Sequence, residues 1–325
     1  MFKKNMAVTR FCPSEKTSVS LKELEEGLEQ YKFKLIEGLD KNSGFVLPSD
    51  PYDDNTLFEG RVKTFEGGWV YGCLRIDTTR ANSSAINRVA AKLMLKGVSK
   101  RDARFDATSK ILQETPPSTT LMPFFINIDT CEGFVFSTNA KVIESFFSLL
   151  RMVLGVELDA KSATTETEKF LTFLWWESEN NTLRNDLVDE YGAVKLWIGD
   201  KVYTTSPICK VSASGGVEEA RIAVSRGGLV TKAEYIISLG EVYRAVGVLL
   251  PSGNFARLSF YKASVIDDSE ASCCLILEEL TKAYAAVDTL ARIFEEAERK
   301  GSSITPKILE VWGRGDFCSK PFENI

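Results

Sequence analysis

The chain has 325 residues and a formal net charge of −5, with 44 % apolar and 26 % charged residues, as is ordinary for a globular protein. It contains no histidine, which excludes Ser-His-Asp and Cys-His catalysis, histidine-ligated zinc and histidine general bases. The seven cysteines are odd in number and include no C-x-x-C pair, so we expect neither a disulfide framework nor a cysteine zinc site. No apolar run reaches the length of a membrane span and no signal-peptide core is present. We therefore expect a cytoplasmic protein.

The first half of the chain mixes strand-like and helical patterns. Strands are expected at 4–12, 44–48, 68–76, 124–129 and 133–138. Helices are expected at 20–33, 82–96, 99–113 and 139–155. Ser20 suits a helix N-cap, as does Asn82 or Ser83, and Gly97 and Gly155 suit helix ends.

The second half predicts a sheet followed by a long helix. Strand-like runs at 228–237, 243–250 and 255–262 are separated by short turns, which is typical of an antiparallel meander. Residues 273–300 predict the C-terminal helix. Because strands and helices do not alternate as regular βαβ units, we expect an α+β fold with mixed and antiparallel sheets and packed helices. We divide the chain into an N-terminal region, 1–160, and a C-terminal region, 161–325.

Basic side chains recur at every fourth position from Arg88 to Arg104, through Lys92, Lys96 and Lys100. Residues 85–110 carry seven Lys or Arg and two Asp, a local charge of +5, so the rest of the chain carries −10. Like charges four residues apart on a helix repel one another. Two interpretations remain open: a solvated helix face, or a surface for a polyanion whose phosphates relieve the repulsion.

The meander offers a second basic surface. Alternation along 229–237 places Leu229, Thr231, Ala233, Tyr235 and Ile237 on one face. We expect that face to pack on the core, with Lys232 on the opposite face. On the third strand Arg257 also points away from the core by the same argument. This surface is either ordinary solvated sheet or part of a binding surface.

Two further patterns suggest chemistry only weakly. Glu157, Asp159 and Lys161 in "VELDAK" form a D-x-K pattern, which a metal-dependent nuclease would need, but no partner Asp is visible upstream. The tandem Trp175–Trp176 can stack on bases or pack in a core, and the apolar run "FLTFLWW" favours the core.

Five segments, in order along the chain, together resemble the RdgC family of recombination-associated DNA-binding proteins. They are "KNMAVTRF", "GFVLP", "INIDTCEGFVFSTNAKVIESFFSLLRMVLG", "VEEARIAVSRGGLVTKAEYII" and "PSGNFARLSF". The resemblance spans nearly the whole chain. It implies an elongated α+β subunit that closes into a ring-shaped homodimer around double-stranded DNA, with basic residues lining the hole.

The resemblance also implies a function. Family members bind duplex DNA with little sequence preference and limit RecA-driven strand exchange. This sequence supports no catalytic residue, metal or cofactor. We expect a non-enzymatic, nucleoid-associated protein that acts on RecA indirectly. The expected DNA-binding residues are Arg88, Lys92, Lys96, Lys100, Arg101, Arg104, Lys210, Lys232 and Arg257.

The turn-rich segment 115–123, "TPPSTTLMP", predicts a projecting arm between the basic helices and the next strand. Within a ring-forming dimer, Leu121 and Met122 are its apolar candidates for a pocket on the partner. Two alternatives to the DNA-binding ring stay open: a nuclease using Glu157 and Asp159, and a protein-interaction factor with the same fold that does not encircle DNA.

Overall fold

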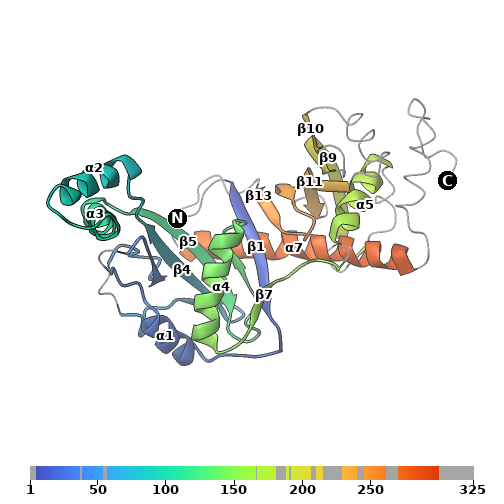
Figure 1. Cartoon of the computed structure of the whole chain (residues 1–325). Helices are drawn as coiled ribbons and strands as arrows, with labels where there is room; N and C mark the ends of the chain where they lie inside the picture. Colours follow the sequence, from blue (N-terminus) through green and yellow to red (C-terminus); the bar gives the residue numbers. More distant parts are fainter. Residues whose placement is uncertain are drawn as a thin grey trace. The chain divides into compact units, whose positions relative to one another are not determined.

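The computed structural model describes residues 5–36, 39–53, 57–165, 167–180, 188–189, 192–205, 210–214, 229–239, 245–260 and 270–299. The chain forms two compact units (Figure 1). Unit 1 comprises Cys12–Val135 and Ala140–Asp159, and unit 2 comprises Phe2–Phe11, Phe136–Asn139 and Ala160–Ile325. Both combine helices with antiparallel strands, which confirms the expected α+β class. The boundary runs through the first strand, which a single division at residue 160 did not foresee.

Unit 1 is built on an antiparallel sheet with the strand order β2-β4-β5-β6. Its strands are β2 (Lys41–Val46), β3 (Thr64–Phe65), β4 (Trp69–Thr78), β5 (Ser118–Asn127) and β6 (Gly133–Val135), and β3 pairs with β4. The helices α1 (Leu21–Gln30) and α4 (Ala140–Leu154) pack on each other. Phe146 of α4 meets Phe124 of β5 with ring centroids 5.1 Å apart. Gly72 lies opposite Phe124, and a Cβ there would fall 2.2 Å from that ring.

The predicted arm at 115–123 is wrong. All ten residues of β5 pair with β4, from Ser118 opposite Thr78 to Asn127 opposite Trp69. Met122 is only 2 % exposed, and Leu121 packs against a buried cluster in the sheet. Met122 is therefore not available to a partner, and Leu121 is only partly exposed. The turn signals before Ser118 mark the end of a helix, and the residues that follow have the propensity to continue as a strand.

The connection between β4 and β5 is a pair of antiparallel helices, which we call the hairpin (Figure 1). It consists of α2 (Ser83–Met94) and α3 (Lys100–Glu114), close to the predicted helices 82–96 and 99–113. Asn82 caps α2 and Ser99 caps α3, each accepting a backbone N–H bond. Gly97 reverses the chain at φ 87°, a conformation that glycine adopts without strain. The hairpin leaves and rejoins the sheet at Thr78 and Ser118, which are themselves paired.

The hairpin has a small core of its own. Ala90 of α2 packs with Ala103 and Ala107 of α3, and the small side chains let the two helices approach closely. Four partly buried residues complete this cluster: Ile86, Val89, Leu93 and Val98. The amide of Val98 returns to the carbonyl of Leu93 at 3.3 Å and closes the turn. This cluster, separate from the core of the sheet, is what holds α2 against α3.

Unit 2 holds a second antiparallel sheet, with the strand order β10-β9-β11-β12-β13-β1. Its strands are β1 (Met6–Pro13), β8 (Val188–Asp189), β9 (Gly192–Thr205), β10 (Lys210–Ser214), β11 (Leu229–Leu239), β12 (Ala245–Leu249) and β13 (Phe255–Phe260). The short β7 (Leu158–Ala160) follows α4. The pairing of β11 with β12 and of β12 with β13 confirms the predicted meander.

Two helices pack on this sheet, α5 (Thr167–Asn180) and α7 (Glu270–Arg299). The long C-terminal helix was predicted at 273–300. Phe294 of α7 meets Phe170 and Phe173 of α5, with ring centroids 5.7 and 5.3 Å away. The Tyr235 hydroxyl of β11 donates to the Leu171 carbonyl of α5 at 3.4 Å. The predicted meander and C-terminal helix therefore form, together with α5, which was not predicted, a sheet covered by helices.

A buried polar cluster joins β1 to α7. The Arg10 guanidinium donates to both carboxylate oxygens of Asp288, at 2.6 and 2.7 Å, and lies 5.0 Å above the ring of Tyr284. The Tyr284 hydroxyl donates to the Val8 carbonyl at 3.0 Å, and the Arg10 amide donates to Asn254 Oδ1 at 2.8 Å. Burial raises the pKa of Tyr284, so its hydroxyl remains a donor at all ordinary pH values.

We predict that Tyr284→Phe lowers the free energy of unfolding by about 1–2 kcal/mol, because the Val8 carbonyl then lacks its buried donor. Urea unfolding followed by circular dichroism measures the change. Tyr52→Phe is the matched control, since Tyr52 is 65 % exposed and its loss should cost less than about 0.5 kcal/mol. Equal effects for the two variants would contradict the role given to Tyr284.

A second prediction concerns the core of the hairpin. Leu93→Ala should loosen α2 from α3 at a cost on the order of 1 kcal/mol, because Leu93 packs on the alanine cluster. Hydrogen exchange read by mass spectrometry should show faster exchange in 83–114 and unchanged exchange in β4. Acceleration that extended equally into β4 would show that the hairpin and the sheet open as one.

Candidate nucleic-acid interface

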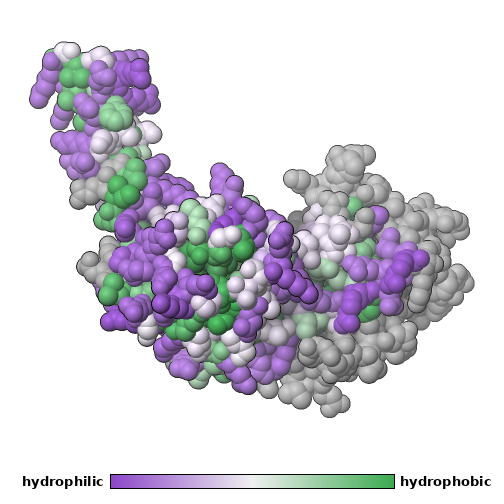
Figure 2. All heavy atoms as spheres, turned by 90° about the horizontal axis from the view of Figure 1, so that it is seen from below, coloured by the Kyte–Doolittle hydropathy of each residue, from purple (hydrophilic) through white to green (hydrophobic). Residues whose placement is uncertain are grey.

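The hairpin carries a concentration of exposed positive charge. Seven of its basic residues are exposed, and we call six of them the hairpin cations: Arg88, Lys92, Lys96, Lys100, Arg101 and Arg104. Within the described part of the chain, none of the six has a carboxylate partner within ion-pair distance. Lys110 differs, since it lies 3.8 Å from Glu114. Figure 2 shows the hairpin standing out from unit 1 with a mainly hydrophilic surface.

Asp102, one of the acidic residues of the hairpin, is engaged within its own helix. Asp102 accepts a hydrogen bond from the Ser99 hydroxyl at 2.7 Å, and its own amide donates to Ser99 Oγ at 3.2 Å. Its carboxylate therefore serves the N-terminal cap of α3. A negative charge at that end of a helix is favourable on its own account.

The five regularly spaced cations do not form one helical stripe. The fourfold spacing runs through Gly97, where the chain reverses, so Arg88 and Lys92 lie on α2 whereas Lys100 and Arg104 lie on α3. Lys96 lies in the turn. The positive charge is thus distributed over two antiparallel helices and their connection. The local charge of +5 was readable from the sequence, but its distribution over the surface was not.

The meander cations have different surroundings. Arg257 of β13 forms an ion pair with Glu234 of β11, which neutralises its charge. The pair also places both side chains on one face, as the alternation predicted. Lys232 is half-buried, whereas Ala233 and Tyr235 are fully buried, which fits its expected place on the opposite face. Lys210 lies in β10, and its side chain falls outside the described residues.

The alternation along β11 holds only in part. Ala233 and Tyr235 are fully buried, as predicted, but Val230 is also fully buried, although strict alternation places it on the opposite face, with Lys232. The register with β9 shifts between Val230 and Lys232, and an extra residue in a strand moves the following side chains to the other face. The Val230 amide donates to Thr172 Oγ1 at 3.0 Å, which fixes this arrangement against α5.

The carboxylates of the nuclease alternative are already engaged. Arg151 of α4 lies 3.0 Å from Glu157 and 3.6 Å from Asp159, so the two face a guanidinium. The described residues contain no group of three or more cysteines or carboxylates placed to hold a metal ion. Trp175 and Trp176 lie in α5, and their side chains are outside the described residues.

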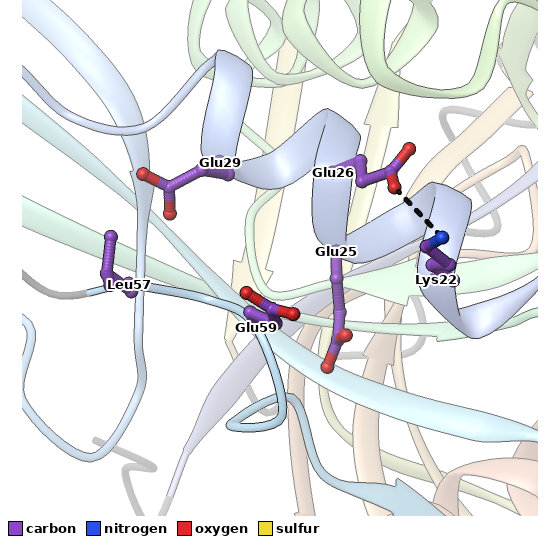
Figure 3. Close-up of a pocket in the computed structure, with 6 residues that line it drawn as sticks. All are labelled: Lys22, Glu25, Glu26, Glu29, Leu57 and Glu59. Carbon is purple, nitrogen blue, oxygen red and sulfur yellow. Dashed lines mark ion pairs between the residues drawn. The ribbon is translucent and has the colours of Figure 1, made fainter.

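A pocket of about 390 Å³ lies between α1 and the segment 57–60 (Figure 3). Lys22, Glu25, Glu26, Glu29, Leu57 and Glu59 line it. Two of its carboxylates hold the wall together: Glu29 accepts from the Phe58 amide at 3.0 Å, and Glu25 accepts from the Gly60 amide at 3.1 Å. Burial opposes ionisation of Glu29, but the hydrogen bonds from Lys32 and Phe58 outweigh it and lower the pKa of this carboxyl. This acidic surface would repel a polyanion.

The sequence reasoning missed three exposed apolar side chains on the hairpin. Leu95 in the turn is 89 % exposed, Phe105 on α3 is 75 % exposed and Met94 at the end of α2 is 41 % exposed. Ala103 and Ala107 mark the buried face of α3, and at 100° per residue Phe105 falls nearly opposite them. That signal was present in the sequence, once the alanine pair is recognised as the buried face.

No described helix has the length and apolar character needed to cross a membrane. No protein-family model matches the chain, and the search of the curated proteins found no match.

Proposed function

We propose that this protein binds double-stranded DNA without sequence preference through the hairpin. The observation that carries the proposal is the set of six exposed hairpin cations, none of which has a carboxylate partner among the described residues. The basic side chains that pair elsewhere, such as Arg10 with Asp288 and Arg75 with Asp77, serve the fold. A phosphate backbone is the partner whose repeating charge suits the hairpin.

The energetics favour a polyanion. Each Lys or Arg that neutralises a phosphate releases condensed counterions, which drives binding at moderate salt. Contacts of this kind position a protein on DNA and do not read its bases. The acidic remainder of the chain, at −10, disfavours binding through other surfaces. We therefore propose that affinity resides in the hairpin and depends little on sequence.

The biological role follows from the resemblance to the RdgC family. A protein that occupies duplex DNA would limit the access of RecA to it, so we propose a non-enzymatic modulator of homologous recombination that is associated with the nucleoid. The ring-shaped homodimer is part of the same proposal. Its closure would use residues other than Leu121 and Met122, since both lie in β5.

We predict that Lys92→Glu combined with Lys96→Glu weakens duplex binding at least tenfold and lowers the salt slope of log K by roughly 0.9 for each lost phosphate contact. Both side chains are exposed, so the circular dichroism spectrum should not change. Fluorescence anisotropy over a range of salt concentrations measures both quantities. The matched control is Arg257→Gln, whose charge Glu234 already neutralises, and it should bind within twofold of the parent. An unchanged affinity and salt slope in the double variant would show that the hairpin cations form an ordinary solvated surface that does not bind DNA.

We also predict that random duplexes of equal length and different sequence bind within a few-fold of one another, with affinity falling steeply as salt rises. Competition titrations with several unrelated duplexes test this. A strong preference for one sequence at physiological salt would contradict a purely electrostatic interface.

A further inference from the structure

Phe105 lies on the outer face of the hairpin with 75 % of its surface exposed. A large aromatic side chain in water forgoes the stabilisation that burial would give it. Nothing in the fold of the hairpin uses this ring, because α2 packs on the opposite face of α3, at Ala103 and Ala107. A polar residue would serve solubility better at this position, so the ring is suited to a binding partner.

Two arginines lie near Phe105 on α3, together with the exposed carboxylates of Asp102 and Asp106. Arg101 is four residues earlier and therefore lies one turn away on the same face of α3. Arg104 adjoins Phe105 in the chain. Both arginines are exposed and belong to the hairpin cations. An aromatic ring flanked by unpaired guanidinium groups combines a stacking surface with phosphate-binding groups, as in proteins that hold single-stranded nucleic acid.

We propose that Phe105 stacks on an unpaired base of gapped or single-stranded DNA while Arg101 and Arg104 contact the flanking phosphates. This inference rests on the proposed DNA-binding function and adds a preference to it. In an intact duplex the bases are stacked on one another and the ring has no base to contact. A gap exposes a base face, so the hairpin would favour DNA that contains unpaired nucleotides.

Charge complementarity favours a nucleic acid over a second copy of this chain. A protein partner for Phe105 would have to accommodate several neighbouring cations, and carboxylates would be needed for that. The acidic pocket of unit 1 is one described surface with such groups (Figure 3). Its Glu25 and Glu29 already accept backbone and lysine hydrogen bonds. They are committed to the wall of the pocket, and this argues against the hairpin of another copy as their partner.

The test compares an intact duplex with the same duplex carrying a gap of a few nucleotides, one of them 2-aminopurine. Phe105→Ala should lose roughly five- to hundredfold in affinity for the gapped DNA, the usual contribution of one stacked base, while intact duplex binding changes less than twofold. Phe105→Trp should retain the gapped-DNA affinity and the quenching of 2-aminopurine. Leu95→Ala is the matched control, since Leu95 is 89 % exposed on the same hairpin and should affect neither substrate.

The outcomes separate the two proposals. Absence of binding to either DNA by the parent protein would overturn the proposed function and this inference with it. Binding of both DNAs by the parent and by Phe105→Ala with equal affinity would overturn the stacking role alone. Sedimentation of the same variants tests a second copy of this chain as the partner of Phe105. A dimer that dissociates in Phe105→Ala, with unchanged affinity for gapped DNA, would assign the ring to a contact between copies and overturn the stacking role.

Discussion

Like-charge repulsion on the hairpin is the physical constraint on which both its packing and its proposed binding depend. Each pair of like charges one turn apart on a helix costs about 0.2–0.5 kcal/mol, and no described carboxylate relieves the hairpin cations. The core that must hold α2 and α3 together against this repulsion consists of three alanines and a few partly buried aliphatic side chains. A bound polyanion would convert the repulsion into affinity.

The sheet of unit 1 supplies the rigidity that the hairpin lacks. The hairpin is inserted between β4 and β5, and its two ends lie at Thr78 and Ser118, which face each other across the ladder. Near this end of the sheet Arg75 and Asp77 form a buried ion pair at 2.7 Å, and the Arg75 guanidinium lies 4.0 Å above the ring of Phe33. Arg75 and Asp77 both belong to β4, so these contacts fix that strand near the point where the hairpin departs. A charged element with a small core is thus presented on a well-packed sheet.

Local chemistry made much of the fold predictable. Ser20 caps α1 with a reciprocal bond from Glu23, and Gly97 ends the first basic helix, as their residue types indicated. The wrong predictions have physical causes that lie outside a short stretch of sequence. Segment 115–123 was interpreted from its prolines, whereas its pairing with β4 decides its structure. The face of Val230 depends on a register shift against β9, a strand distant in sequence.

The positive charge of the candidate site could be predicted from the sequence, but the ion-pair partners of the individual cations could not. Clustering of the hairpin cations follows from their spacing alone, because both helices are short and adjacent. Whether a cation forms an ion pair depends on its tertiary neighbours. Glu234 of β11 contacts Arg257 of β13 because both strands pair with β12, and no local sequence pattern predicts this contact. The sequence therefore could not separate the binding candidates on the hairpin from the neutralised arginine of the meander.

The most direct measurement is hydrogen exchange of the full-length protein with and without a random duplex. If the hairpin is the DNA-binding surface, protection on adding DNA should centre on residues 82–114 and should disappear at high salt. Protection confined to β11 and β13, with no change in the hairpin, would contradict the account.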